Sequence, residues 1–245
     1  MKFLGSLTIL GAVLAASTSI ASATPIQLGS YASNASSQGN ANSSMSVTGV
    51  DLTNGTPTGL GTLTAPASGS TYALNPNGVW TSALSDSTWV GVASTAGPGG
   101  TANPAYGYYE FQTTFDVTAG TYDGTLNVLA DDTVEVLLNG TVIVPFGDLG
   151  NDSTCAQFAT GCLASTETSL ILSDITLDAT NTLDFIVEQA GNPAGSAGTD
   201  PSGVDFNASL DPATTPEPGS ILLLGTGLLG AAGIARRKIA TRFMA

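Results

Sequence analysis

Hydrophobic and polar residues alternate along much of the second half of the chain, as they do in half-buried β-strands. Between Phe111 and Val117 every second position carries a hydrophobic or threonine side chain, with polar residues between them. This alternation predicts a strand with one face in a hydrophobic core. Further predicted strand faces are Leu126, Val128 and Ala130; Val134, Val136 and Leu138; Leu183, Phe185 and Val187; and Val204, Phe206, Ala208 and Leu210.

Turn-forming residues separate these strands. Asn139-Gly140 lies between two short hydrophobic segments and predicts a hairpin, because a type I′ turn needs positive φ at both central positions. Pro145 should end the second strand of that hairpin. We expect a turn from Gly120 to Gly124, and another from Asp178 to Asn181 after a strand over Leu170 to Leu177.

From Thr24 to about Ser70 the chain is rich in Ser, Asn, Gly and Thr, so its strands in this stretch should be short. Val47 to Leu52 is its best strand candidate, and Ala93 to Ala105 has the Gly and Pro content of a loop. No amphipathic helix of normal length is predicted in the domain. Strands joined by wide loops favour an all-β sandwich over a barrel.

The first 23 residues have the pattern of a secretory signal peptide. Lys2 precedes an apolar stretch from Leu7 to Ala16, and Ala21-Ser22-Ala23 supplies small residues for cleavage. We expect export through the Sec machinery and cleavage after Ala23. The alternative is an N-terminal anchor helix, for which the apolar stretch is too short.

The last thirty or so residues carry a second targeting pattern. Pro216, Glu217 and Pro218 precede an apolar run, which is followed by a basic cluster of Arg236, Arg237 and Lys238. A helix over residues 220–235 would extend roughly 24 Å at 1.5 Å per residue, short of the roughly 20 residues that usually span a membrane. A buried core helix is the alternative, but no later element follows to pack it.

This C-terminal arrangement resembles the PEP-CTERM sorting signal of Gram-negative bacteria. The resemblance implies an exported precursor that the C-terminal helix holds in the membrane. It also implies processing near Pro216-Glu217-Pro218 by an exosortase, in species that make extracellular polysaccharide. The mature protein is then expected at the cell surface or outside the cell. The chain therefore divides into a signal peptide at 1–23, an exported domain at 24–213, and a sorting signal at 214–245.

The charge distribution narrows the function of the exported domain. All five basic residues lie in the two targeting segments, so Thr24 to Thr215 contains no Lys, Arg or His. An acidic surface without cations repels phosphate backbones, which excludes nucleic acid as a partner. Catalysis through a Ser-His-Asp triad, a lysine Schiff base or histidine metal ligands is excluded as well. Glycoside hydrolysis by paired carboxylates and calcium binding by oxygen ligands stay open.

Cys155 and Cys162 are the two cysteines of the chain, and in an exported protein they should form a disulfide. Two thiols without histidine are a poor zinc site. The closed loop is short, so the bridge should shape a loop rather than hold the domain together. The neighbouring Asp148, Asn151 and Asp152 are candidate calcium ligands, and no other cofactor is expected.

Two further pairs of residues have competing interpretations. Trp80 and Trp89 are expected in the core, with a sugar-stacking platform as the alternative. Asp131 and Asp132 are expected to cap the tight connection between two strands, with a ligand role as the alternative.

The strand order, with Leu129 to Val136, Leu138-Asn139-Gly140 and Asn181 to Val187, resembles galactose-binding-like jelly rolls over Trp89 to Leu210. The resemblance implies carbohydrate binding at loops on one end of a sandwich. The domain differs from that family in one respect: it lacks the Arg or His residues that commonly bind sugar hydroxyls. We therefore expect an exported, non-enzymatic protein associated with exopolysaccharide or a biofilm matrix. The alternatives are a carbohydrate-binding module and an acidic-pair glycoside hydrolase.

Overall fold

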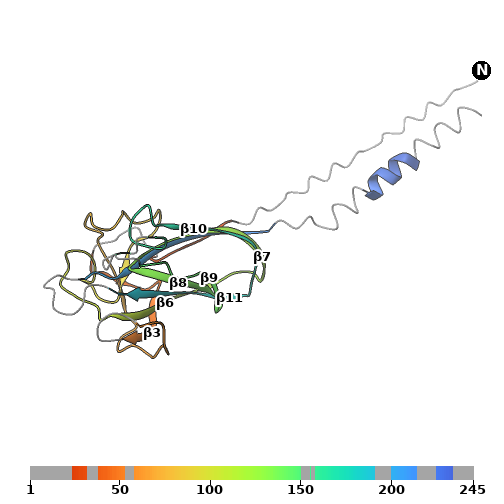
Figure 1. The fold of residues 1–245 in the computed structure, drawn as a ribbon. Coiled ribbons are helices and arrows are strands. Elements are labelled where there is room, and N and C mark those ends of the chain that lie inside the picture. Colours follow the sequence, from red (N-terminus) through yellow and green to blue (C-terminus); the bar gives the residue numbers. More distant parts are fainter. Residues whose placement is uncertain are drawn as a thin grey trace, which may run out of the picture.

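The structure, a computed structural model, describes residues 24–31, 38–52, 58–149, 155, 158–190, 200–213 and 225–233. Two antiparallel sheets lie face to face and form an all-β sandwich, as predicted (Figure 1). Sheet A has the order β10-β7-β12-β5-β4-β2, with β1 paired to β12, and sheet B has the order β3-β6-β11-β8-β9. The strands of sheet A are β1 (Ile26–Gly29), β2 (Ala41–Asn42), β4 (Thr71–Ala73), β5 (Val90–Gly91), β7 (Gly120–Asp131), β10 (Thr168–Leu177) and β12 (Gly203–Pro212). Those of sheet B are β3 (Ser46–Leu52), β6 (Gly107–Asp116), β8 (Thr133–Leu138), β9 (Thr141–Val144) and β11 (Thr180–Gln189).

The main core lies between the sheets and consists of the side chains that the alternation predicted. Phe185 of β11 and Phe206 of β12 are fully buried and stack across the interface, with ring centroids 4.4 Å apart. Along β11 and β12, side chains point alternately into the core and away from it, because successive side chains of a strand point to opposite faces. Burial of these apolar faces is what drives the two sheets together.

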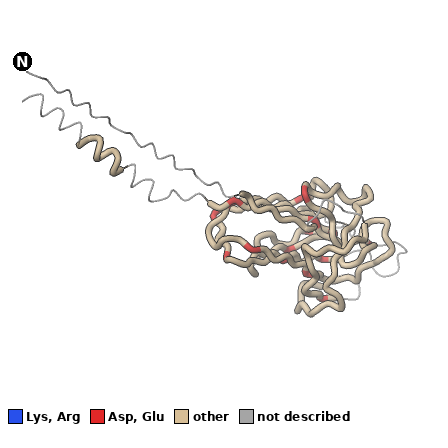
Figure 2. The backbone as a smooth tube through the Cα atoms, turned by 180° about the vertical axis from the view of Figure 1, so that it is seen from behind, with Lys and Arg blue, Asp and Glu red and all other residues tan. Residues whose placement is uncertain are grey.

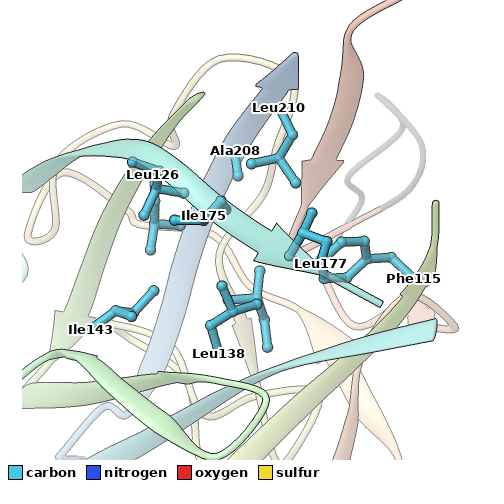
Figure 3. A pocket seen from close by; sticks show the side chains of 10 residues that line it. Phe115, Leu126, Leu138, Ile143, Ile175, Leu177, Ala208 and Leu210 are labelled. Carbon is cyan, nitrogen blue, oxygen red and sulfur yellow. The ribbon is translucent and has the colours of Figure 1, made fainter. Parts of the chain in front are cut away.

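The core leaves a small gap near the end of β12. Phe115, Leu138, Leu177 and Leu210 lie on its walls, which are apolar throughout (Figure 3). Its volume, about 10 Å³, is at the lower limit for a single water molecule. The gap is therefore a packing defect of the core and has neither the size nor the polar groups of a ligand site.

The predicted hairpin is confirmed. Asn139 and Gly140 have φ values of 49° and 77°, and they connect β8 to β9. The turn expected from Gly120 to Gly124 is wrong, because β7 already begins at Gly120. Its pairing with β10 and β12 continues the strand through these small residues, and the chain reverses before Gly120 instead.

Strand β1 was not predicted, although it closes the domain. Ile26 pairs with Leu210, and Gly29 pairs with Asn207, so the start of the domain lies against its last strand. Four residues are too few for an alternation to be recognised in the sequence, so only the pairing with β12 identifies this strand.

A second hydrophobic cluster lies on the outer face of sheet A. Leu129 of β7 points away from the main core and packs with Trp80 and Trp89 from the loops. Both tryptophans are buried, which confirms that they are core residues. Cys155 and Cys162 join this cluster and form the predicted disulfide, with Cα atoms 5.7 Å apart. The bridge therefore fastens a loop onto the outside of the sandwich.

The C-terminal segment is described only at 225–233, which is helical and exposed throughout. None of the helices within the described part of the chain is long and apolar enough to cross a membrane. Residues 1–23, including Ala23, lie outside the described residues, as do Pro216, Glu217, Pro218, Arg236, Arg237 and Lys238. The signal peptide and the full extent of the C-terminal helix stay predictions.

Candidate functional site

Asp131 and Asp132 lie where the chain crosses from one sheet to the other. Asp131 is the last residue of β7 and pairs with Gly203 in sheet A. The backbone N–H of Asp132 donates to the carbonyl of Glu188 in sheet B, at 3.1 Å. The peptide bond between the two aspartates is cis, and both side chains are fully buried. The crossing therefore buries two carboxyl groups at one end of the sandwich.

Asp131 is held by a loop tryptophan. The indole Nε1 of Trp80 donates to Oδ2 of Asp131 at 2.6 Å, and the Trp80 ring lies 4.3 Å from that of Trp89. Ser202 also donates from its hydroxyl to the backbone carbonyl of Asp131, at 3.3 Å. Among the described residues, no group hydrogen-bonds to the buried Oδ1 of Asp131. Half of this carboxyl group is thus paired and half is not.

Asp132 and Asp200 complete an acidic cluster with Asp131. Oδ2 of Asp132 accepts a hydrogen bond of 2.6 Å from the backbone N–H of Ala190, just beyond the end of β11. Asp200 is buried, and its backbone N–H donates to the side-chain oxygen of Asn103 at 3.2 Å. The loops before β12 and after β5 therefore meet at this cluster.

The electrostatics of the cluster favour a bound proton. Burial, and next the charge of Asp132, raise the pKa of Asp131 well above its usual range, although the hydrogen bond from Trp80 opposes the shift. Burial, Asp200 and Asp132 likewise raise the pKa of the Tyr106 hydroxyl. No cation compensates these carboxylates, because the described residues of the sandwich include Asp and Glu but no Lys or Arg (Figure 2).

Gln189 adds uncompensated polar atoms at the same end. It follows Phe185 and Val187 on the inward face of β11 and is fully buried. Neither its amide nitrogen nor its amide oxygen has a hydrogen-bond partner within the part of the chain that the structure describes. Buried amides are rarely left without hydrogen-bond partners.

The cluster does not form a preassembled metal cage. Within the described ranges, no group of three or more Asp, Glu, Cys or His side chains could hold a metal ion. Of the candidate calcium ligands, Asp148 lies in the described segment after β9, whereas Asn151 and Asp152 fall outside the described residues.

The sequence prediction for Asp131 and Asp132 needs correction. They were expected to cap their own connection, but their carboxyl groups accept hydrogen bonds from Trp80 and Ala190, which are 51 and 58 positions away. No pattern in the sequence indicated that Trp80, Asp200 and Gln189 lie near these aspartates. Loops separated by long stretches of chain bring them together, and no local spacing records such contacts.

Residues 214–238 match the family model of the PEP-CTERM protein-sorting motif. The chain carries a PEP-CTERM sorting signal. The match includes Pro216 to Lys238, the residues on which the sequence resemblance rested. A PEP-CTERM signal implies an exported, membrane-anchored precursor and processing by an exosortase. No curated protein matches the chain in sequence.

Solved structures with some likeness include enzymes and modules that act on carbohydrates. A Podospora anserina GH26-CBM35 β-(1,4)-mannanase is 15% identical over 79% of this chain and 29% of its own, with a TM-score of 0.30. A Kluyveromyces marxianus β-glucosidase is 14% identical over 45% of this chain and 12% of its own, with a TM-score of 0.25. A family 35 carbohydrate-binding module from Clostridium thermocellum is 15% identical over 44% of this chain and 83% of its own, with a TM-score of 0.22. The chain spans less than a third of the length of the mannanase.

Proposed function

We propose that this protein is an exported, non-catalytic β-sandwich that its sorting tail delivers to the cell envelope of a Gram-negative bacterium, where it associates with extracellular polysaccharide. The observation that carries the proposal is the PEP-CTERM signal at 214–238. The charge distribution supports it, because the basic residues are confined to the targeting segments and the domain between them is acidic. A basic cluster after an apolar run stays on the cytoplasmic side, which leaves the acidic domain outside.

The positions of the strands support the proposed division of the chain. The sandwich begins at Ile26 and ends at Pro212, close to the expected boundaries of the exported domain at 24 and 213. Because Ile26 pairs with Leu210, both targeting segments join the sandwich at the same end. Removing the signal peptide after Ala23 and the sorting signal after its processing would leave every strand intact.

Two features support a non-catalytic role. Asp131 and Asp132 are fully buried, and Trp80 hydrogen-bonds to Asp131, so a substrate has no access to these two carboxyl groups. The cluster also lacks a partner of opposite charge that would keep one carboxylate ionised as a nucleophile while the other acts as an acid. The acidic-pair hydrolase is therefore the weaker alternative.

A carbohydrate-binding module is the stronger alternative and is compatible with the same export route. The observation that favours it is a polar groove on the outer face of sheet A, lined by residues other than those of the acidic cluster.

Fractionation of the producing cells tests the proposal. We expect the mature protein with the cell surface or with the extracellular polysaccharide, and intact-mass analysis should find neither residues 1–23 nor the basic cluster at Arg236. A mature protein that stays in the cytoplasm, or that fractionates away from the polysaccharide, would contradict the proposal.

A further inference from the structure

The outer face of sheet A is covered at one end and open at the other. Leu129 and Asp131 lie beneath loops on the covered part, whereas Asn127, two residues earlier on the same face of β7, lines an open groove. The groove has a volume of about 530 Å³. Ligand sites typically occupy roughly 300 to 1,000 Å³, so the groove is large enough for a small ligand or a segment of a polymer.

A row of side-chain amides forms the floor. Asn127 of β7 and Asn207 of β12 are directly paired in the sheet, and Nδ2 of Asn127 donates to Oδ1 of Asn207 at 2.8 Å. Nδ2 of Asn207 continues the row to Ser85, with 2.9 Å to its carbonyl and 3.1 Å to its hydroxyl. Alongside, Nε2 of Gln27 donates to the hydroxyl of Ser209 at 2.7 Å. These contacts fix the orientation of each amide.

The row retains hydrogen-bonding capacity toward the solvent. Among the described residues, no donor reaches Oδ1 of Asn127 or Oε1 of Gln27. The side-chain amides of Asn127 and Gln27 each carry two N–H donors. The contacts described above use only one donor of each amide. Donors and acceptors therefore alternate along the floor. That mixture suits hydroxyl groups, which donate and accept at the same atom.

The wall of the groove is fixed in place by a buried carboxylate. Asp205 accepts hydrogen bonds from the Ser30 hydroxyl at 2.9 Å, from the backbone N–H of Leu84 at 2.7 Å, and from the Ser87 hydroxyl. These bonds hold the loop that carries Ser85 and Asp86 against the sheet. A Cβ at Gly29 would lie 2.9 Å from the carbonyl oxygen of Asp86, so the missing side chain of this glycine allows the close approach.

The charge of the groove residues indicates which class of polymer can bind. The groove residues include the carboxylate of Asp86 and no cation, and the whole of Thr24 to Thr215 lacks Lys, Arg and His. An anionic polymer would meet repulsion without a compensating contact. The half-buried ring of Tyr31 adds an apolar surface next to the amides, as in sites where a sugar packs one face on an aromatic ring.

We propose that the groove over β1, β7 and β12 binds a neutral, hydroxyl-rich polysaccharide chain through the amides of Asn127, Asn207 and Gln27. This inference rests on the proposed function and names the surface that would make the association. The site lies on a sheet face and is distinct from the loops at the end of the sandwich that hold the acidic cluster.

Affinity electrophoresis of the processed protein, purified from producing cells, tests the inference. The gels contain galactomannan, xyloglucan, mixed-linkage β-glucan, polysaccharide extracted from the producing cells, or anionic polygalacturonate. We expect at least one neutral polysaccharide to retard the wild-type protein and polygalacturonate to have no effect. Asn127→Ala with Asn207→Ala should weaken the retardation by about tenfold or more, because two hydrogen bonds are lost.

A second groove variant and a matched control separate binding from folding. Thr125→Leu adds volume at an exposed groove position and leaves the amide row intact, so it should also weaken binding. Gln112→Ala removes an equivalent amide from the outer face of sheet B, where Nε2 donates to Asp184 at 2.7 Å, and should bind like the wild type.

Several outcomes would overturn the inference. They are retardation by none of the neutral polysaccharides, retardation by polygalacturonate, and wild-type binding by both groove variants. Self-association in light scattering that the groove variants abolish would assign the groove to a second copy of the chain. If the groove variants bind normally while the wild-type protein still fractionates with polysaccharide, the groove assignment fails and the proposed function stands.

Discussion

The indole nitrogen of Trp80 donates a hydrogen bond of 2.6 Å to Oδ2 of Asp131, and both side chains are buried. This contact joins an irregular loop to the last residue of β7. It also supplies the hydrogen bond that opposes the upward pKa shift of Asp131. The Trp80 indole therefore holds the loop that covers this part of sheet A. It also donates a hydrogen bond to a carboxyl group that has no cation nearby.

Trp80→Phe should destabilise the fold by about 2 kcal/mol at neutral pH, because it removes the hydrogen bond to Oδ2 of the buried Asp131 carboxyl group. Urea denaturation followed by circular dichroism measures the free energy of unfolding. Val79→Ala is the matched control, since Val79 precedes Trp80 in the same loop but is 59% exposed. Equal stabilities for the two variants would show that the hydrogen bond contributes nothing.

The free energy of unfolding should increase as the pH is lowered from 7 toward 4. Burial raises the pKa of Asp205 to about 6 and that of Asp131 well above its usual range, so the native state binds more protons than the unfolded state in this window. By linkage, stability then falls as the pH rises through the folded-state pKa. Urea titrations at a series of pH values measure the profile.

Asp205→Asn provides the control for that profile. It removes the titrating group but keeps a side chain of similar shape beside Ser30 and Ser87. The variant should show a flatter dependence of stability on pH between about 4 and 6. A wild-type profile that falls steadily on acidification would contradict the assignment of raised pKa values.

Loss of the disulfide should weaken the loop cover without unfolding the sandwich. Cys155→Ser with Cys162→Ser removes a bridge between residues seven positions apart, so the expected loss is below about 3 kcal/mol. Differential scanning calorimetry of this variant and of the wild type measures the change. Thiol labelling of the unreduced wild-type protein should detect no free cysteine, and stoichiometric labelling would refute the bridge.

Processing should depend on the sorting signal rather than on the sandwich. Glu217→Gln should block cleavage and leave a membrane-bound precursor, whereas deletion of residues 220–245 should release a folded, soluble domain. Fractionation and intact-mass analysis of both variants in the producing cells provide the measurement. Mature wild-type protein that retains residues 236–245 would instead support a simple membrane anchor.

The local pattern was enough to predict most of the long strands. The alternation around Phe111, the hairpin at Asn139-Gly140 and the final strand at Val204 to Leu210 all appear in the structure. Each of these signals depends on neighbours in the sequence, because a strand repeats every two residues and a type I′ turn is set by two residues. The targeting signal at 214–238 is equally local.

Short pairings were not predictable in this way. Strand β1 has four residues and is recognised by its register with β12, in which Ile26 lies opposite Leu210. The turn expected at Gly120 to Gly124 was wrong because long-range strand pairing, which local residues do not reveal, extends β7 through this segment. The pairing of β7 with strands on both sides outweighed the low strand propensity of its glycines.

The sequence by itself determined the all-β architecture, the absence of cations from the exported domain, and the C-terminal sorting signal. Asn127, Leu129 and Asp131 share one face of β7, and only the tertiary structure determined which of them loops cover. Loops cover Leu129 and Asp131, whereas Asn127 faces an open groove. Alternation specifies which face of a strand a residue occupies, but only contacts between distant segments determine whether that face is covered or left open for a ligand.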